Sequence, residues 1–411
     1  EVDLKELVAA RPSRLQNGQM LRPGSFFMKS SSSAPVVISR KSPYEVREEG
    51  EGKFFLFEGE EKIDGEIFFP KPKPRVGAEP LTSKGTPISR LLISQRNCFI
   101  LMPVRHCEYF SNGDQCKFCN FNSGQEAARS VGLSRPVTEN LDECVEAYQI
   151  RSSEVKLYEG RFEMGGFTKG EREEAIHTSF VERIAQAGPT KPFLLIHGEA
   201  MPRKALQRLK DAGLDSLTIQ IEAWDKQVFE ASCPGKVKHT SYDGWVDSVS
   251  EAIDVFGVGS VACKTIGGIS LVAEGGHKTW QEARDTHIEH IREMFKIGAL
   301  PSIGCLRLPV GSVWGTDASL KEKLPPTEYY LDLFTPHHEA MTETGYYDKL
   351  NKFMYCGFEC AHAVYSGDIG ILERAGNWGN WMSDVVPDKA NWILNWLRTI
   401  ESTTTAPAIA Q

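Results

Sequence analysis

The sequence lacks the features of membrane, secreted and nucleic-acid-binding proteins. It has no apolar run of membrane-spanning length, and its N-terminal stretch EVDLKELVAARPSR contains no secretory hydrophobic region. No Lys/Arg-rich run stands out, and the net charge is −8. Ten cysteines in 411 residues are too sparse for a disulfide scaffold. We therefore expect a soluble cytoplasmic protein with no membrane and no nucleic-acid partner.

Familiar hydrolase motifs are missing too. The chain contains neither a G-x-S-x-G elbow nor an H-E-x-x-H helix, and it has no internal repeat or low-complexity tract. A barrel-type hydrolase or lyase without a metal cluster stays open as an alternative, but no motif supports it. Hydrophobic residues make up 41% and charged residues 25%, which is an ordinary globular balance.

The pattern of the chain changes twice, which predicts three parts. Residues 1–85 carry short β-like runs separated by Gly/Glu turns and predict a small β-rich N-terminal domain. Residues 86–325 alternate strand-like and helical patterns, which indicates an α/β fold with a parallel sheet, open or closed into a (β/α) barrel. Residues 326–411 predict a helical C-terminal extension. The predicted strands of the middle part are 91–93 with 99–101, 161–164, 193–197, 216–221, 260–271 and 301–307.

Three cysteines close together in one loop are the most informative feature. Cys107, Cys116 and Cys119 form Cys-x8-Cys-x2-Cys directly after the apolar run NCFILMPV. The loop follows the first strand of the βα region, so we expect it at the carboxyl end of the sheet, where α/β proteins build their sites. Three thiolates at this spacing can hold an iron–sulfur cluster or a zinc ion. A cluster held by only three cysteines leaves one iron open.

The ligand set has alternatives. Cys98 lies near the loop and competes with Cys107 as the first ligand, and a structural zinc site of Cys98, Cys107, Cys116 and Cys119 is a second reading. Cys356 and Cys360, with His362 nearby, form a partial set that indicates a possible auxiliary cluster or a packed turn. We expect the remaining cysteines to be small buried hydrophobic residues: Cys144, Cys233, Cys263 and Cys305.

The sequence CKFC, with aromatic Phe118 before the last cysteine, resembles the cluster loop of the radical S-adenosylmethionine (SAM) superfamily. The usual first gap there is three residues, whereas here it is eight. The resemblance covers roughly residues 90–315 and is closest to the biotin-synthase-like branch. It implies a partial or full parallel (β/α) barrel of radical SAM type, a [4Fe-4S] cluster held by the three cysteines, and SAM as the second cofactor.

The resemblance also implies residues that contact SAM. Gly165 and Gly166 resemble the glycine turn after the second strand, although its usual glutamate is absent. Glu222 occupies the position of the acid on the fourth strand, with Gln220 two residues earlier, and Glu199 ends the third strand. Arg307 lies in the run that resembles the sixth strand and its loop. His106 and His197 are further candidates for substrate contacts, although a structural role is the simpler reading for each.

The function implied is an enzyme that reductively cleaves SAM to a 5′-deoxyadenosyl radical, which abstracts hydrogen from a small-molecule substrate. Biosynthetic rearrangement and C–C or C–S bond formation are the reaction types expected, with an electron donor such as flavodoxin or ferredoxin as partner. The alternative is a non-catalytic zinc or iron–sulfur protein in which the cysteine loop is structural.

Overall fold

The computed structural model describes residues 25–27, 33–35, 43–50, 53–67, 79–95, 98–130, 136–154, 159–163, 171–189, 191–346 and 349. The described chain divides into two compact units, one containing residues 25–67 and the other residues 79–349. Three sets of predicted positions lie outside the described residues: Gly165 with Gly166, Cys356 with Cys360 and His362, and the extension beyond residue 349.

Short antiparallel strands make up the described part of the first unit. β1 (Ser25–Phe27) pairs with β2 (Ser33–Pro35), and β3 (Tyr44–Glu48), β4 (Phe54–Glu58) and β5 (Glu61–Ile67) form a three-stranded sheet. Between β4 and β5 the chain turns at Gly59, whose φ of 58° lies in the left-handed region that favours glycine. Antiparallel strands separated by Gly/Glu turns are what the sequence predicts here.

A seven-stranded sheet forms the centre of the second unit. Six of its strands are parallel and adjacent in chain order, and β6 pairs antiparallel with β7 at one edge. This confirms an α/β fold with a parallel sheet. Within the described residues β6 and β12 are the two edges of the sheet, so closure into a barrel stays a prediction. The strands are β6 (Leu92–Gln95), β7 (Cys98–Leu101), β8 (Glu159–Glu163), β9 (Phe193–Gly198), β10 (Ser216–Glu222), β11 (Val261–Gly267) and β12 (Leu300–Cys305).

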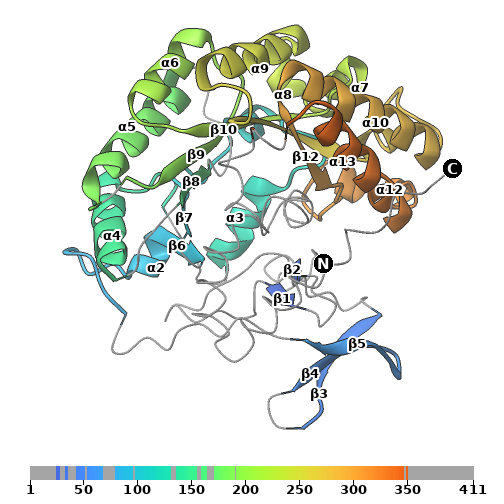
Figure 1. Cartoon of the computed structure of the whole chain (residues 1–411), viewed down its shortest axis with the longest axis horizontal. Helices are drawn as coiled ribbons and strands as arrows, with labels where there is room; N and C mark the ends of the chain where they lie inside the picture. The colour runs from blue at the N-terminus through green and yellow to red at the C-terminus, as the bar shows by residue number, and fades with distance from the viewer. Residues whose placement is uncertain are drawn as a thin grey trace, which may run out of the picture. The chain divides into compact units, whose positions relative to one another are not determined.

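Helices connect the parallel strands and line the outer side of the curved sheet, while α3 lies on its inner side (Figure 1). Parallel strands need crossover connections of this kind, usually through a helix. The helices are α2 (Ile88–Leu91), α3 (Phe121–Ser130), α4 (Leu141–Glu154), α5 (Glu171–Ala187), α6 (Arg203–Asp211), α7 (Lys226–Ser232), α8 (Pro234–His239), α9 (Tyr242–Phe256), α10 (Trp280–Ile297), α11 (Ala318–Lys321), α12 (Thr327–Asp332) and α13 (Phe334–Glu343), with 3₁₀ turns η1 (Glu108–Asn112), η2 (Ile269–Leu271) and η3 (Trp314–Thr316).

Local signals in the sequence fix the ends of the clearest helix. Thr279 and Glu282 form a capping box at the start of α10, each side chain accepting a hydrogen bond from the other residue's backbone N–H. Gly298 ends α10 in the left-handed conformation with φ of 92°. Helices α12 and α13 pack against α10, so residues 327–343 belong to the same unit as the sheet. Residues 327–343 are the first part of the predicted C-terminal extension, 326–411.

One face of the parallel sheet is apolar and carries the core. Strand register places a set of residues on this face, and none of their side chains is exposed. They pack with Tyr148 of α4, Ile184 of α5 and Trp245 of α9 in one hydrophobic cluster. Burying such a continuous apolar face is the main stabilising term for this layer. The set comprises Phe99, Leu101, Phe162, Leu194, Ile196, Leu217, Ile219, Val261 and Cys263.

Gly160 of β8 provides a test of this packing. A Cβ at this position would overlap the buried ring of Phe99, which itself lies 5.0 Å from the Tyr148 ring. We expect Gly160→Ala to destabilise the protein by roughly 1–3 kcal/mol through overpacking, measured as a lower thermal midpoint. Adding Phe99→Leu makes room for the methyl group, so the double variant should lose less stability than the two single losses added together. Strict additivity would contradict this packing.

Candidate functional site

The site predicted from the sequence lies at the carboxyl ends of the parallel strands. The cysteine loop begins after β7, Glu199 follows β9, and Glu222 is the last residue of β10. Since the strands are parallel, these ends meet at the same edge of the sheet. The structure therefore brings segments far apart in the sequence to one place.

Asn122 fixes the first predicted ligand of the loop. The Cys107 backbone N–H donates to Asn122 Oδ1 at 3.0 Å, and Asn122 Nδ2 donates to the Cys107 carbonyl at 3.1 Å. Asn122 Nδ2 also lies 3.2 Å from Nδ1 of His106, whose Nε2 lies 3.3 Å from Ser111 Oγ. His106 thus helps to hold the loop. Asn122 was not predicted, and its spacing from Cys107 carries no signal in the sequence.

The middle of the loop packs on the turn between α7 and α8. Lys117 N–H donates to the Ser232 carbonyl, and Gly235 N–H donates to the Asp114 carbonyl, both at 2.9 Å. A Cβ at Gly235 would meet the Asp114 carbonyl at 2.6 Å and overlap the Tyr109 ring. Glycine is therefore required for this close approach.

The far side of the loop contacts the segment after β12. Trp314 N–H donates to the Lys117 carbonyl at 2.9 Å, and Asn120 Nδ2 donates to the Val310 carbonyl at 3.0 Å. The ring of Phe118 lies 6.3 Å from that of Trp314. The cysteine loop thus links the ends of the first and last parallel strands, and Phe118 contributes packing to that link.

The three loop cysteines are near neighbours but do not form a metal site as they stand. In residues 43–349, as far as they are described, no group of three or more His, Cys, Asp or Glu side chains is arranged to hold a metal ion. Cys107 and Cys116 are buried thiols and Cys119 is half-buried. Burial, with the charges of Cys116 and Cys107 adding to it, raises the pKa of Cys119 to about 12. The donor set is suitable for an iron–sulfur cluster, because a bound metal stabilises thiolates that burial alone keeps protonated.

Cys233 is a neighbour of the loop that sequence reasoning assigned to the core. It is fully buried, as expected, but it also belongs to the turn on which the loop docks. The pKa of Cys116 is raised, mainly by a hydrogen bond with the Cys233 thiol and then by burial. The spacing of 117 residues between the two cysteines hides this pairing from a reading of the sequence.

Lys236 of α8 forms a buried ionic cluster beside the loop. Only 3% of this residue is exposed, and its Nζ lies 3.3 Å from Glu199 Oε1 and 3.1 Å from Glu222 Oε1. The same ammonium donates to the Gln220 carbonyl and lies 4.6 Å from the centroid of the Trp245 ring. Burial acts to lower the pKa of Lys236, but the two carboxylates outweigh it and raise that pKa well above its ordinary value.

Two carboxylates share this single ammonium, so one of them is poorly compensated. Burial raises the pKa of Glu199 to about 7; the Lys236 ammonium opposes the rise and the charge of Glu222 adds to it. The predicted acids Glu199 and Glu222 therefore do meet in one cluster. Lys236, which joins them, was not predicted, because a lysine in a short helix is normally exposed.

Glu222 also has an unusual backbone. Its φ of 71° is the one positive value of a non-glycine residue in the described chain, and the register of β10 shifts between Ile219 and Glu222. Such a conformation costs about 1–3 kcal/mol and is found where a site requires it. Here it ends β10 with the carboxylate directed to Lys236, whereas the side chain of Gln220 lies 3.2 Å from His197 Nδ1.

Arg307 does not join this cluster. It lies beyond the end of β12 with an exposed side chain, and it makes no hydrogen bond or ion pair with another described residue. Its role as a cofactor contact stays a prediction.

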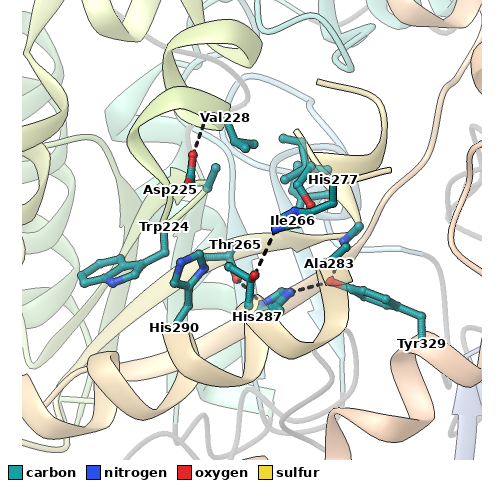
Figure 2. Close-up of a pocket in the computed structure, with 15 residues that line it drawn as sticks. Trp224, Asp225, Val228, Thr265, Ile266, His277, Ala283, His287, His290 and Tyr329 are labelled. Atoms are coloured by element: carbon teal, nitrogen blue, oxygen red, sulfur yellow. Dashed lines mark hydrogen bonds between the residues drawn. The ribbon is translucent and has the colours of Figure 1, made fainter. Parts of the chain in front are cut away.

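A small pocket lies nearby, between the ends of β10 and β11 and the first half of α10 (Figure 2). Tyr329 OH accepts from the Gly268 N–H at 2.9 Å and lies 2.8 Å from His287 Nδ1, while His287 Nε2 lies 3.4 Å from Thr265 Oγ1. Burial lowers the pKa of His287 to about 3, so the ring is neutral. The neutral imidazole contacts the tyrosine hydroxyl through Nδ1 and the threonine hydroxyl through Nε2, one ring nitrogen donating and the other accepting. This chain of bonds ties α10 and α12 to β11.

Comparison with known proteins gives similar folds rather than close relatives. No protein-family model matches the chain, and no curated protein matches its sequence. Among solved structures, HydG, a maturase of the [FeFe]-hydrogenase, has a TM-score of 0.46 at 12% identity over 76% of this chain and 80% of that one.

Two further structures are similar to a lesser degree. Methylornithine synthase (PylB) has a TM-score of 0.39 at 14% identity, over 62% of this chain and 69% of that chain. Coproporphyrinogen III oxidase (HemN) from Escherichia coli, described as a radical SAM enzyme, has a TM-score of 0.37 at 14% identity over 56% and 50%. Scores below 0.5 decide neither the closure of the sheet nor the activity, so the chain's own residues must carry the functional assignment.

The ionic cluster predicts a specific pH dependence. Because the pKa of Glu199 is about 7 in the folded state and 4.5 ordinarily, the folded protein holds an extra proton between these values. Its free energy of unfolding therefore falls as pH rises through this window. Glu199→Gln removes that ionisation, so its stability relative to wild type should rise by roughly 1–3 kcal/mol from about pH 5 to about pH 8.

Urea unfolding at the two pH values measures this difference. Glu182→Gln, at an exposed position on α5, is the control and should show little change. A Glu199→Gln difference that does not vary with pH would show that Glu199 keeps one ionisation state throughout.

The His287 bonds give a second prediction. Tyr329→Phe removes the hydroxyl that hydrogen-bonds both Gly268 N–H and His287 Nδ1. Both buried groups then lose this hydrogen-bond partner. We expect a loss of about 1–3 kcal/mol in the free energy of unfolding. A loss below about 0.5 kcal/mol would mean that water replaces the hydroxyl without penalty.

Proposed function

We propose that the protein is a radical SAM enzyme of the biotin-synthase-like branch, acting on a small molecule in the cytoplasm. The observation that carries the proposal is the placement of the three-cysteine loop. It follows the first parallel strand and packs on the α7–α8 turn, beside the buried carboxylates of Glu199 and Glu222. A structural loop would not need two acids and a lysine buried at its side.

In this proposal Cys107, Cys116 and Cys119 hold a [4Fe-4S] cluster, with SAM as the second cofactor. When bound, the two together supply a 5′-deoxyadenosyl radical that abstracts hydrogen from the substrate. The thiols must turn toward one another to take the cluster, and Cys116 must give up its hydrogen bond with Cys233. Asn122 keeps the Cys107 backbone in place while this happens.

The ionic cluster suits the methionine end of SAM. Glu199 and Glu222 together carry one negative charge more than Lys236 neutralises when both are ionised. An ammonium group beside them would complete the charge balance, and the low exposure of all three residues makes that attraction strong. Glu222 is our first choice as ligand, since its strained backbone is explained by such a role.

The remaining assignments are part of the same proposal. Gln220 lies next to Glu222 and contacts His197, so it belongs to the surroundings of the cofactor. Gly165 and Gly166 would let backbone approach SAM, and Arg307 would contact it from the sixth strand. Cys356 and Cys360 would hold an auxiliary cluster. A flavodoxin or ferredoxin would supply the electron.

Iron content tests the ligand set. Anaerobic reconstitution of the full chain should give a brown protein with about four irons per chain. Cys116→Ala or Cys119→Ala should abolish the colour and the iron, whereas Cys144→Ala, which removes a buried thiol from α4, should keep both. Comparing Cys107→Ala with Cys98→Ala decides the first ligand. A colourless protein with stoichiometric zinc would contradict the proposal.

Cleavage of SAM tests the activity. With dithionite, the reconstituted protein should release 5′-deoxyadenosine and methionine. Glu222→Gln should keep the iron but weaken SAM binding at least about tenfold, because it removes a charged hydrogen bond. Unchanged SAM binding in this variant would remove Glu222 from the site.

A further inference from the structure

The face of the parallel sheet opposite the apolar core carries polar side chains. Strand register places His197 of β9 opposite Thr218 of β10, and Lys264 of β11 opposite Ser302 of β12. Because side chains alternate along a strand, these residues lie on the face of the sheet opposite the core residues. The core positions on the other face are buried and apolar, whereas this face mixes polar side chains with buried apolar ones such as Leu195 and Leu300.

Lys264 is the cation of this inner face. It is half-buried on β11 and follows Cys263, whose partner on the neighbouring strand, Ile219, comes directly before Gln220. Within the described part of the chain its ammonium has no hydrogen bond and no ion pair. Lys236 of α8, by contrast, is paired with two carboxylates. Lys264 therefore differs from the other lysine of the site in having its charge available.

The surroundings of Lys264 offer further donors. Its Cε lies 3.9 Å from where a Cβ at Gly304 would stand, so the side chain lies over β12. Ser302 presents a hydroxyl at the same level, and Gln220 with His197 forms a hydrogen-bonded pair next to it. An ammonium flanked by a hydroxyl and an amide is the set of donors that binds an oxyanion.

We propose that the substrate of this enzyme carries a carboxylate or phosphate group, and that Lys264 binds it from the inner face of the sheet. The inference rests on the proposed function, since it places the substrate on the inner face of the same sheet that carries the cysteine loop at its strand ends. It deepens that function by assigning the substrate class and a residue that determines specificity.

Binding of small anions to the full chain tests the proposal without any turnover. Acetate, succinate and inorganic phosphate are titrated at constant ionic strength, and ¹³C-methylated lysines are observed by NMR. The signal that is missing in Lys264→Arg identifies Lys264, and it should shift saturably with at least one of the anions. Saturation with succinate or acetate indicates a carboxylate substrate, and saturation with phosphate indicates a phosphorylated one.

Substitutions separate the role of the charge from that of the fold. Lys264→Gln should weaken anion binding about 10- to 100-fold, measured by calorimetry, whereas Lys264→Arg should retain most of it. Lys204→Gln, at an exposed position on α6, is the matched control and should bind as wild type does. Equal binding by wild type and Lys264→Gln, or no saturable binding by wild type, would overturn the proposal.

A parallel measurement on Cys116→Ala keeps the two proposals distinguishable. If this variant loses its iron but still binds the anion through Lys264, the oxyanion site stands independently of the cluster. If wild type loads four irons and cleaves SAM but binds no anion, only the substrate class assigned here is wrong.

Discussion

The site depends on the ion pairs that the buried ammonium of Lys236 makes with Glu199 and Glu222. This ammonium joins α8 to the ends of β9 and β10 through Glu199, Glu222 and the Gln220 carbonyl. Removing it would leave two carboxylates facing each other in a buried place, which costs several kcal/mol. Because the cysteine loop docks on the turn where α8 begins, the position of that loop depends on the same ammonium.

The cysteine loop is held on both sides by backbone hydrogen bonds, which it makes with Ser232 and Gly235 on one side and with Trp314 on the other. Within it Cys107 and Cys116 are buried and Cys119 is half-buried. Two segments that are far apart in the sequence therefore fix the backbone of the loop, and its thiols are largely withdrawn from solvent.

Much of the plan could be predicted from the sequence because it depends on local pattern. Alternating strand and helix signals indicated the parallel sheet. The cysteine spacing selected the loop after β7, and the resemblance to radical SAM enzymes indicated Glu199 and Glu222. The domain boundaries and the closure of the sheet could not be predicted in the same way, since they depend on which surfaces meet.

The sequence by itself determined the alternation of strands and helices and the presence of three thiols in one loop, because these follow from periodicity and spacing. Only the tertiary structure decided what surrounds those thiols. Asn122, Cys233 and Lys236 come from α3, the α7–α8 turn and α8, and their types alone favour solvent, core or surface roles. The segments that follow parallel strands bring such residues to the strand ends, and that convergence has no trace in local sequence.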